Sequence, residues 1–215
     1  LHKAPEFSKH QNLMSDGKYG RPDRLPDYYE RKEIFAAALE TLTMGGYIRT
    51  GYDHFAKPTD SVARAMAEGK MRWNALGVTA GRYNNVIGVG VHSYSTIGEY
   101  YFQNLYDIRK YQESLGQRSF PVFRGHKLTR DDLIRRSVIQ TLRGFFSLDT
   151  ESVENKYGIN FKEYFKAELA ALDSYVKDGL VEIQDAAIVV TEKGHQFANT
   201  VCYVFDNYKQ PRPRF

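Results

Sequence analysis

The chain has 215 residues, a formal net charge of +4 and 42% apolar residues, enough for one large domain or two small ones with a real core. No apolar run approaches the roughly 20 residues of a membrane-spanning helix, and no secretory signal is recognisable. The single cysteine, Cys202, excludes a disulfide framework and cannot alone hold an iron–sulfur cluster or a cysteine-rich zinc site. We therefore expect a cytoplasmic protein with no membrane partner.

The N-terminal part of the sequence predicts alternating helices and strands. Residues 1–26 lack periodicity and read as an extended loop. Asp27 and Glu30 then have the spacing of a capping box for a helix that ends at Gly45-Gly46. A short apolar run at 47–50 predicts a strand directly after this helix.

The same alternation continues beyond this strand. A second helix is predicted to start at 58–60 and to end at Gly69, and a third spans 105–115. Between them, the run Val-Ile-Gly-Val-Gly-Val at 86–91 is apolar on both faces, as in a buried parallel strand. This order of helices and strands is typical of a β/α layer.

A change of character at 119–121 predicts a domain boundary, which divides the chain into residues 1–120 and 121–215. In the second part Thr129 and Asp132 form a further capping box. Helices are predicted from 129 onward and at 149–157, 160–178 and 191–207, with a hairpin formed by 180–183 and 188–191. Three helices, a two-stranded wing and a final helix describe a winged-helix-like module.

Motifs for nucleotide or metal binding are weak in this sequence. Gly88-Val89-Gly90 lacks the third glycine of a dinucleotide fingerprint, and the six histidines show no metal-ligand spacing. Asp53 and His54 could act as a general acid/base couple, or His54 could be a structural residue. Neighbouring residues of a strand point to opposite faces, so we expect their side chains not to touch.

Basic residues gather between positions 109 and 143, and arginine suits bidentate binding of carboxylate or phosphate. They are Arg109, Lys110, Arg118, Arg124, Lys127, Arg130, Arg135, Arg136 and Arg143. A polycarboxylate ligand, a nucleic acid or a solvated helix face would each fit this cluster. The predicted helix at 161–177 balances three acids against three lysines, so we expect no nucleic-acid partner.

Several longer strings resemble the oxygen-independent coproporphyrinogen III oxidases, in collinear order over about residues 28–208. They are GYDHFAKP (51–58), GVGVHSYSTIG (88–98), QN (103–104), LTRDDLIRRSVIQ (128–140), GINFKEYFKAEL (158–169), DGLVEI (178–183), VTEKG (190–194) and NTVCYVFDNY (199–208). The resemblance implies an α/β fold: the terminal part of an incomplete radical-SAM β/α barrel, followed by a helical winged-helix-like C-terminal domain.

The resemblance also implies chemistry. Such enzymes use a [4Fe–4S] cluster, held by three cysteines, to cleave S-adenosylmethionine, and the resulting radical starts the oxidative decarboxylation of coproporphyrinogen III to protoporphyrinogen IX. The cysteine motif does not occur in this sequence. We therefore expect a C-terminal half that is inert alone, has no metal ligands, and works with a missing N-terminal barrel half on a tetrapyrrole substrate.

Residues matching the family's motifs are the expected site residues. Cofactor contacts are expected at Tyr94, Asp53, His54 and Asn74, and substrate contacts at Phe55, Arg135 and Arg136. No catalytic residue is assigned to this chain.

Three positions depart from the family pattern. Leu76 stands where these oxidases carry a glutamine, Tyr94 replaces a smaller aliphatic residue, and Tyr52 replaces a methionine. Bulk and polarity near the cofactor have therefore changed together. These changes keep open an alternative function, that of a haem-binding, haem-trafficking or haem-modifying paralogue.

Overall fold

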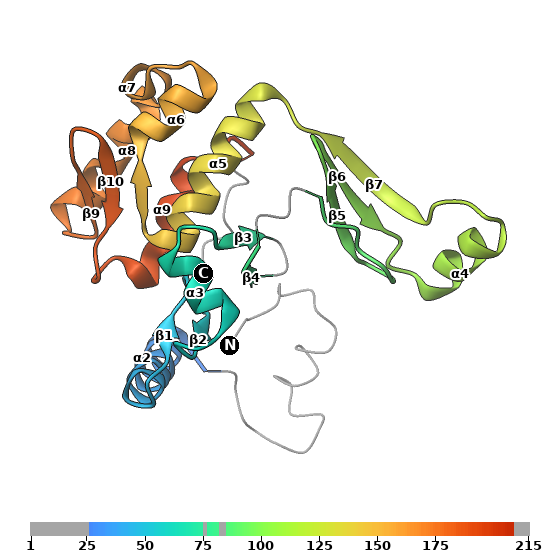
Figure 1. Cartoon of the computed structure of the whole chain (residues 1–215), viewed down its shortest axis with the longest axis horizontal. Helices are drawn as coiled ribbons and strands as arrows, with labels where there is room; N and C mark the ends of the chain where they lie inside the picture. The colour runs from blue at the N-terminus through green and yellow to red at the C-terminus, as the bar shows by residue number, and fades with distance from the viewer. Residues whose placement is uncertain (1–25, 75–76, 82–84, 209–215) are drawn as a thin grey trace. The chain divides into compact units, whose positions relative to one another are not determined.

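The computed structural model describes residues 26–74, 77–81 and 85–208 (Figure 1). The chain divides into two compact units, residues 1–48 and 49–215. Within the described ranges, no helix has the length and apolar character needed to cross a bilayer. The predicted N-terminal loop and the departure at Leu76 lie outside the described residues, apart from Pro26 at the end of that loop.

The first unit contains helix α2 (Tyr28–Met44), which begins and ends as the sequence predicts. The Asp27 carboxylate accepts hydrogen bonds from the backbone N–H groups of Tyr29 and Glu30, at 2.9 and 3.0 Å. The Glu30 carboxylate in turn accepts from the Asp27 N–H at 2.7 Å. These bonds satisfy N–H groups that the first turn of a helix leaves without partners, so the capping box is confirmed.

The second unit begins in β1 (Ile48–Arg49), which is followed by β2 (Phe55–Ala56) and α3 (Ser61–Ala67). The strand predicted at 47–50 is thus only two residues long, because the chain turns back and the Thr50 N–H bonds the His54 carbonyl at 2.8 Å. Asp60 caps α3 through the Val62 N–H. The predicted second helix is confirmed.

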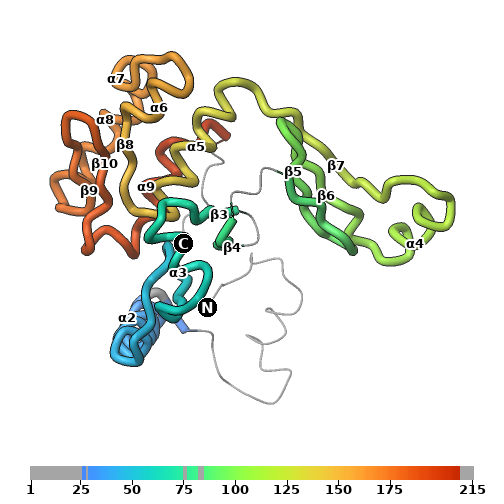
Figure 2. Tube along the Cα trace, viewed as in Figure 1, coloured from blue at the N-terminus to red at the C-terminus, as the bar shows by residue number. Residues whose placement is uncertain are grey.

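Two antiparallel sheets follow. Strands β3 (Arg72–Asn74) and β4 (Gly77–Thr79) form a hairpin. Strands β5 (Tyr94–Ile97), β6 (Tyr100–Asn104) and β7 (Val122–Lys127) form a sheet in the order β5-β6-β7. Figure 2 shows the chain leaving β6, passing through α4 (Ile108–Gly116) and returning as β7 beside β6. Sequence reasoning missed this sheet.

The prediction of a buried parallel strand at 86–91 is wrong. Val86 alone pairs, in an antiparallel bridge with Thr96, while Ile87 and Val89 are 73% and 85% exposed. The Asn104 side-chain amide donates to the carbonyls of Gly88 and Gly90 at 3.2 and 2.9 Å, so it holds this segment as a loop. The pairings within β3-β4, β5-β6-β7 and β8-β10-β9 are all antiparallel.

The C-terminal part is mainly helical. Its helices are α5 (Arg130–Phe145), α6 (Thr150–Tyr157), α7 (Phe161–Tyr164), α8 (Lys166–Lys177), the 3-10 helix η1 (His195–Phe197) and α9 (Ala198–Val204). Its strands, β8 (Ser147–Asp149), β9 (Val181–Ile183) and β10 (Ala187–Val190), form an antiparallel sheet in the order β8-β10-β9.

The predicted capping box at Thr129 is confirmed, and so are the helix at 149–157, with Asp149 as its cap, and the hairpin of β9 and β10. Two helices differ from their predictions. The helix starting after Asn160 is divided at Phe165 into α7 and α8, and the helix predicted at 191–207 is shortened to η1 and α9.

The hydrophobic core lies among the C-terminal helices. Ile134, Val138 and Leu142 repeat along one face of α5 and are at most 1% exposed, as the periodicity predicts. They belong to one cluster with buried side chains from α7, α9, β8, β9 and β10. The boundary predicted at 119–121 stays a prediction, and β7, which follows it, pairs with β6, which precedes it.

Replacing Leu142 by alanine tests this core. Leu142 is fully buried, so Leu142→Ala should lower the free energy of unfolding by roughly 2–5 kcal/mol through lost burial and the cavity left behind. Urea denaturation followed by circular dichroism measures this. The control is Leu115→Ala on α4, where the side chain is 50% exposed and the change should stay within about 0.5 kcal/mol. Equal losses in both variants would contradict the assignment of the core.

Candidate ligand-binding site

A cavity of about 800 Å³ opens within the second unit. Its walls come from β3, from the sheet β5-β6-β7, and from helices α5 and α6. This volume lies within the roughly 300–1,000 Å³ range of small-molecule sites in proteins. The cavity is therefore the first place to look for a bound ligand.

One face of the three-stranded sheet supplies two rows of side chains to the cavity. Because side chains alternate between the faces of a strand, residues paired across the sheet lie side by side on the same face. The rows are Tyr94, Gln103 and Arg124, and Thr96, Tyr101 and His126. The register of the sheet thus decides which side chains meet a ligand.

The lining is basic and aromatic. Its charged side chains are Arg72, Glu99, Arg124, Arg136 and Lys156. Its aromatic side chains, besides His126, are Trp73, Tyr94, Tyr101, Phe102 and Tyr157. Four cationic groups face one carboxylate, so the lining favours an anionic ligand with flat apolar parts.

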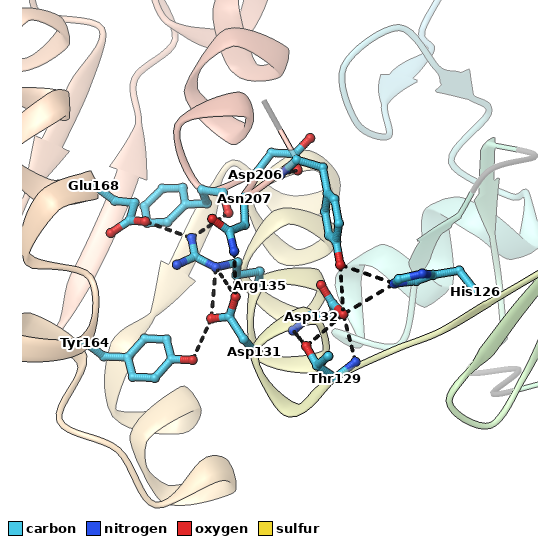
Figure 3. A network of polar contacts seen from close by, with 11 residues as sticks. His126, Thr129, Asp131, Asp132, Arg135, Tyr164, Glu168, Asp206 and Asn207 are labelled. Atoms are coloured by element: carbon cyan, nitrogen blue, oxygen red, sulfur yellow. Dashed lines mark hydrogen bonds and ion pairs between the residues drawn. The ribbon is translucent and has the colours of Figure 1, made fainter. Parts of the chain in front are cut away.

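Arg135 and Arg136 are neighbours in sequence, but they face different surroundings. Arg135 is 14% exposed and donates from Nε to Asp131 and from Nη1 to Glu168, both at 2.8 Å (Figure 3). It also donates to the Phe205 carbonyl at 3.0 Å. Although burial alone would lower it, the hydrogen bonds to Glu168 and Asp131 raise the pKa of Arg135. Arg135 therefore joins α5, α8 and the end of α9.

Arg136 follows about 100° further around the helix and lines the cavity. Its guanidinium lies 5.8 Å from the centre of the Tyr101 ring, a cation–π contact across the cavity wall. Among the described residues it has no carboxylate partner. Its charge is therefore available to a ligand.

At the start of α5, Asp132 collects donors from three segments (Figure 3). Its Oδ2 accepts from the Thr129 N–H at 2.7 Å and from the Tyr208 hydroxyl at 3.3 Å, and it lies 3.5 Å from Nε2 of His126. Burial by itself would raise the pKa of Asp132, but these hydrogen bonds, with one from the Thr129 hydroxyl, lower it below 3.8. The cavity-lining His126 is thereby tied to α5.

The segment GYDHFAKP lies outside this lining: among the described residues, Asp53, His54 and Phe55 do not face the cavity. The prediction that Asp53 and His54 do not touch is wrong, because the chain turns here and brings Nδ1 of His54 within 2.7 Å of Oδ1 of Asp53. The contact is nevertheless not a well-aligned hydrogen bond, because Nδ1 has no hydrogen-bond partner among the described residues. Nε2 of His54 abuts Gly77, where a Cβ would lie only 2.6 Å away.

Of the expected site residues, Asn74, Tyr94 and Arg136 line the cavity, whereas Arg135 lies in the ion-pair network. Sequence reasoning assigned no role to Gln103, Tyr101 or Lys156, and it noted Arg124 only as a member of the basic cluster. Only the sheet register brings Gln103 and Arg124 together: Gln103 lies in the string QN (103–104), whereas Arg124 lies in none of the strings that carry the resemblance.

Comparison with known proteins gives concordant matches. Residues 128–197 match the family described as HemN C-terminal domain. The oxygen-independent coproporphyrinogen III oxidase of Salmonella typhimurium is 38% identical over 190 residues, covering 88% of this chain and 42% of that protein. The enzyme of the same name from Thermostichus vulcanus is 34% identical over 207 residues, covering 96% of this chain and 64% of the relative.

A solved structure agrees with these sequence matches. It is described as "Coproporphyrinogen III oxidase (HemN) from Escherichia coli is a Radical SAM enzyme", and it superposes with a TM-score of 0.81 at 36% identity. The match covers 86% of this chain and 43% of that one. The chain therefore has the mixed α/β fold of the matched part. Over most of its own length it is similar to the oxygen-independent coproporphyrinogen III oxidases, and it spans about two-fifths of the length of the Salmonella and Escherichia relatives.

An iron–sulfur cluster does not fit the described residues of this chain. Among them, no group of three or more histidine, cysteine and acidic side chains could hold a metal ion. Cys202 is 3% exposed, and burial raises the pKa of its thiol to about 12, whereas cluster ligands are thiolates. Any cluster would need ligands from elsewhere.

The different surroundings of Arg135 and Arg136 predict different effects on stability. Arg135→Met leaves the Asp131 and Glu168 carboxylates without their partner, so the free energy of unfolding should fall by about 2–3 kcal/mol. The loss stays below that of a fully buried pair because Asp131 is 32% exposed. Arg136→Met breaks no ion pair and should change stability by about 0.5 kcal/mol or less. Urea denaturation measures both, and a larger loss for Arg136→Met would contradict the assignment.

Asp132 predicts a dependence of stability on pH. Its pKa is lower in the folded chain than the ordinary 3.8, so its contribution is fully present above pH 3.8 and is lost as pH falls through the folded value. The difference in unfolding free energy between the unaltered chain and Asp132→Asn should thus be largest near neutral pH and shrink in acid. A difference that does not vary between pH 7 and pH 3 would show that the carboxylate charge is irrelevant.

Proposed function

We propose that this chain is part of a radical S-adenosylmethionine enzyme of tetrapyrrole metabolism, which decarboxylates coproporphyrinogen III oxidatively to protoporphyrinogen IX. The observation that carries the proposal is the 38% identity over 190 residues to a curated oxidase of that activity. The TM-score of 0.81 to a structure described as a radical SAM enzyme supports it independently.

The domain assignment belongs to the same proposal. Residues 1–120 would form the end of the radical-SAM barrel, and residues 121–215 a winged-helix-like C-terminal domain. S-adenosylmethionine and a [4Fe–4S] cluster would act in the protein that contains this chain, and the cluster would be held by the N-terminal barrel half. The cofactors would supply the radical chemistry, and this chain alone would be inert.

The cavity lining fits the proposed substrate. Coproporphyrinogen III has pyrrole rings and four propionate groups, which need aromatic contacts and cationic partners. Arg136 would bind a propionate, with its guanidinium held beside Tyr101. Arg135 would serve the substrate only indirectly, by fixing the rotation of α5 through its ion pair with Glu168 on α8.

The remaining expected contacts are proposals of the same kind. Asn74 and Tyr94 face the cavity and would contact S-adenosylmethionine. Asp53 and His54 lie on the turn before β2, and Phe55 begins that strand. None of the three is in the lining, so their contact with cofactor or substrate would need another surface.

The test uses the complete protein that contains this chain, purified and reconstituted without oxygen. It receives S-adenosylmethionine, a reductant and coproporphyrinogen III, and mass spectrometry follows 5′-deoxyadenosine and the porphyrin products. We expect deoxyadenosine together with protoporphyrinogen IX. The test variant is Arg136→Gln, which should lose most of the decarboxylation. The matched control is Lys127→Gln, which removes a cation on β7 outside the cavity lining and should retain the activity.

Other outcomes would overturn the proposal. Deoxyadenosine without decarboxylation would mean that the radical acts on another substrate. Tight haem binding with neither product would favour the haem-handling paralogue.

A further inference from the structure

Gln103 and Arg124 form a hydrogen-bonded pair in the wall of the cavity. Gln103 is 4% exposed, and its Oε1 accepts a hydrogen bond from Nε of Arg124 at 2.7 Å. The two residues face each other directly across β6 and β7, and both line the cavity. Burying an amide costs free energy unless its polar atoms are bonded, so this arrangement calls for an explanation.

The bond engages one edge of the guanidinium and leaves the other edge free. Among the described residues, the terminal nitrogens of Arg124 have no hydrogen-bond or ion-pair partner, and the neighbouring Phe123 ring lies 5.9 Å from the guanidinium carbon. Arginine recognises a carboxylate through two parallel N–H groups. A guanidinium held through Nε by a neutral acceptor keeps its full charge and presents its Nη1 and Nη2 groups.

Gln103 is better suited to this task than a carboxylate would be. An acid at the same place would also orient Arg124, but it would neutralise the charge and weaken the attraction for an anion. The amide oxygen orients the guanidinium and leaves its charge to the ligand. Orienting Arg124 before binding also reduces the conformational entropy lost when a ligand binds.

We propose that Gln103 and Arg124 form a preorganised carboxylate anchor at the β6–β7 wall of the cavity, in which Arg124 contacts the ligand and Gln103 is a positioning residue. The proposal rests on the proposed function for the identity of the ligand, but not for its chemistry. The carboxylate could come from a propionate of the tetrapyrrole or from the amino-acid end of S-adenosylmethionine, since Tyr94 lies in the same row.

The experiment measures binding to the 215-residue chain by titration calorimetry. One pair of ligands is coproporphyrin III and its uncharged tetramethyl ester, and the other is S-adenosylmethionine and its decarboxylated form. Sodium propionate, followed through the Arg124 Nε–H resonance by NMR, reports on the anchor alone. The variants are Arg124→Gln, Arg124→Lys and Gln103→Leu, with Lys127→Gln as the matched control that removes a cation from the same strand.

For the ligand whose carboxylate is bound, Arg124→Gln and Arg124→Lys should raise Kd about ten- to a hundredfold, as expected for a lost hydrogen bond to a charged group. Its uncharged or decarboxylated form should be unaffected. Gln103→Leu should lower the preference for the acid form while keeping the charge, and it should have no further effect in an Arg124→Gln background. Lys127→Gln should change nothing. The acid, coproporphyrin III or S-adenosylmethionine, whose Kd rises in the Arg124 variants identifies the source of the carboxylate.

Several results would overturn the anchor. These are unchanged acid binding in both Arg124 variants, an equal loss for the acid and the ester, or the absence of any response of Arg124 in the unaltered chain to all the carboxylates. A response to propionate without binding of coproporphyrin III would keep the anchor and count against the proposed function. Coproporphyrin binding that is independent of Arg124, with no dependence of S-adenosylmethionine or propionate binding on Arg124 either, would count against the anchor and leave the proposed function standing.

Discussion

The ion pair of Arg135 with Glu168 on α8 fixes the orientation of helix α5, and the candidate site depends on that orientation. Asp131 and Glu168 hold the guanidinium on one side of the helix, while the apolar stripe around Val138 is fully buried in the core. With these two sides of α5 fixed, the direction of the Arg136 side chain, about 100° further around the helix than Arg135, is fixed as well. Arg136 therefore faces the cavity rather than solvent or core.

The wall of the cavity formed by the sheet β5-β6-β7 is determined by strand register. An antiparallel sheet aligns residues that are far apart in sequence and puts every second side chain on one face. Gln103 and Arg124 are separated by helix α4, yet they meet because the register of β6 and β7 pairs them. A slip of β7 by one residue against β6 would turn Arg124 to the other face of the sheet and separate it from Gln103. A helix with fixed rotation and a sheet with fixed register together give a basic, aromatic cavity.

The sequence predicts local features well, because caps and buried helix faces depend on neighbouring residues. The boxes at Asp27 and Thr129 and the stripe along α5 needed no long-range information. The pairing of β7 with β6 was missed because α4 separates the two strands and leaves little local trace of it, whereas the hairpin of β5 and β6 has a local signal, the Gly98-Glu99 turn, that was overlooked. The run at 86–91 has the composition of a buried strand, but its glycines and the Asn104 amide hold it as a loop. Likewise, the sequence alone does not show which of Arg135 and Arg136 forms ion pairs.

The central claim is that this cavity receives a carboxylated tetrapyrrole, and the most direct measurement is a crystal structure of the chain grown with coproporphyrin III. We expect the macrocycle between the sheet β5-β6-β7 and helix α5, with one carboxylate on Arg136 and another group within reach of Arg124. A macrocycle bound elsewhere, for example against the turn that carries Asp53 and His54, with the cavity free of ligand, would contradict the account.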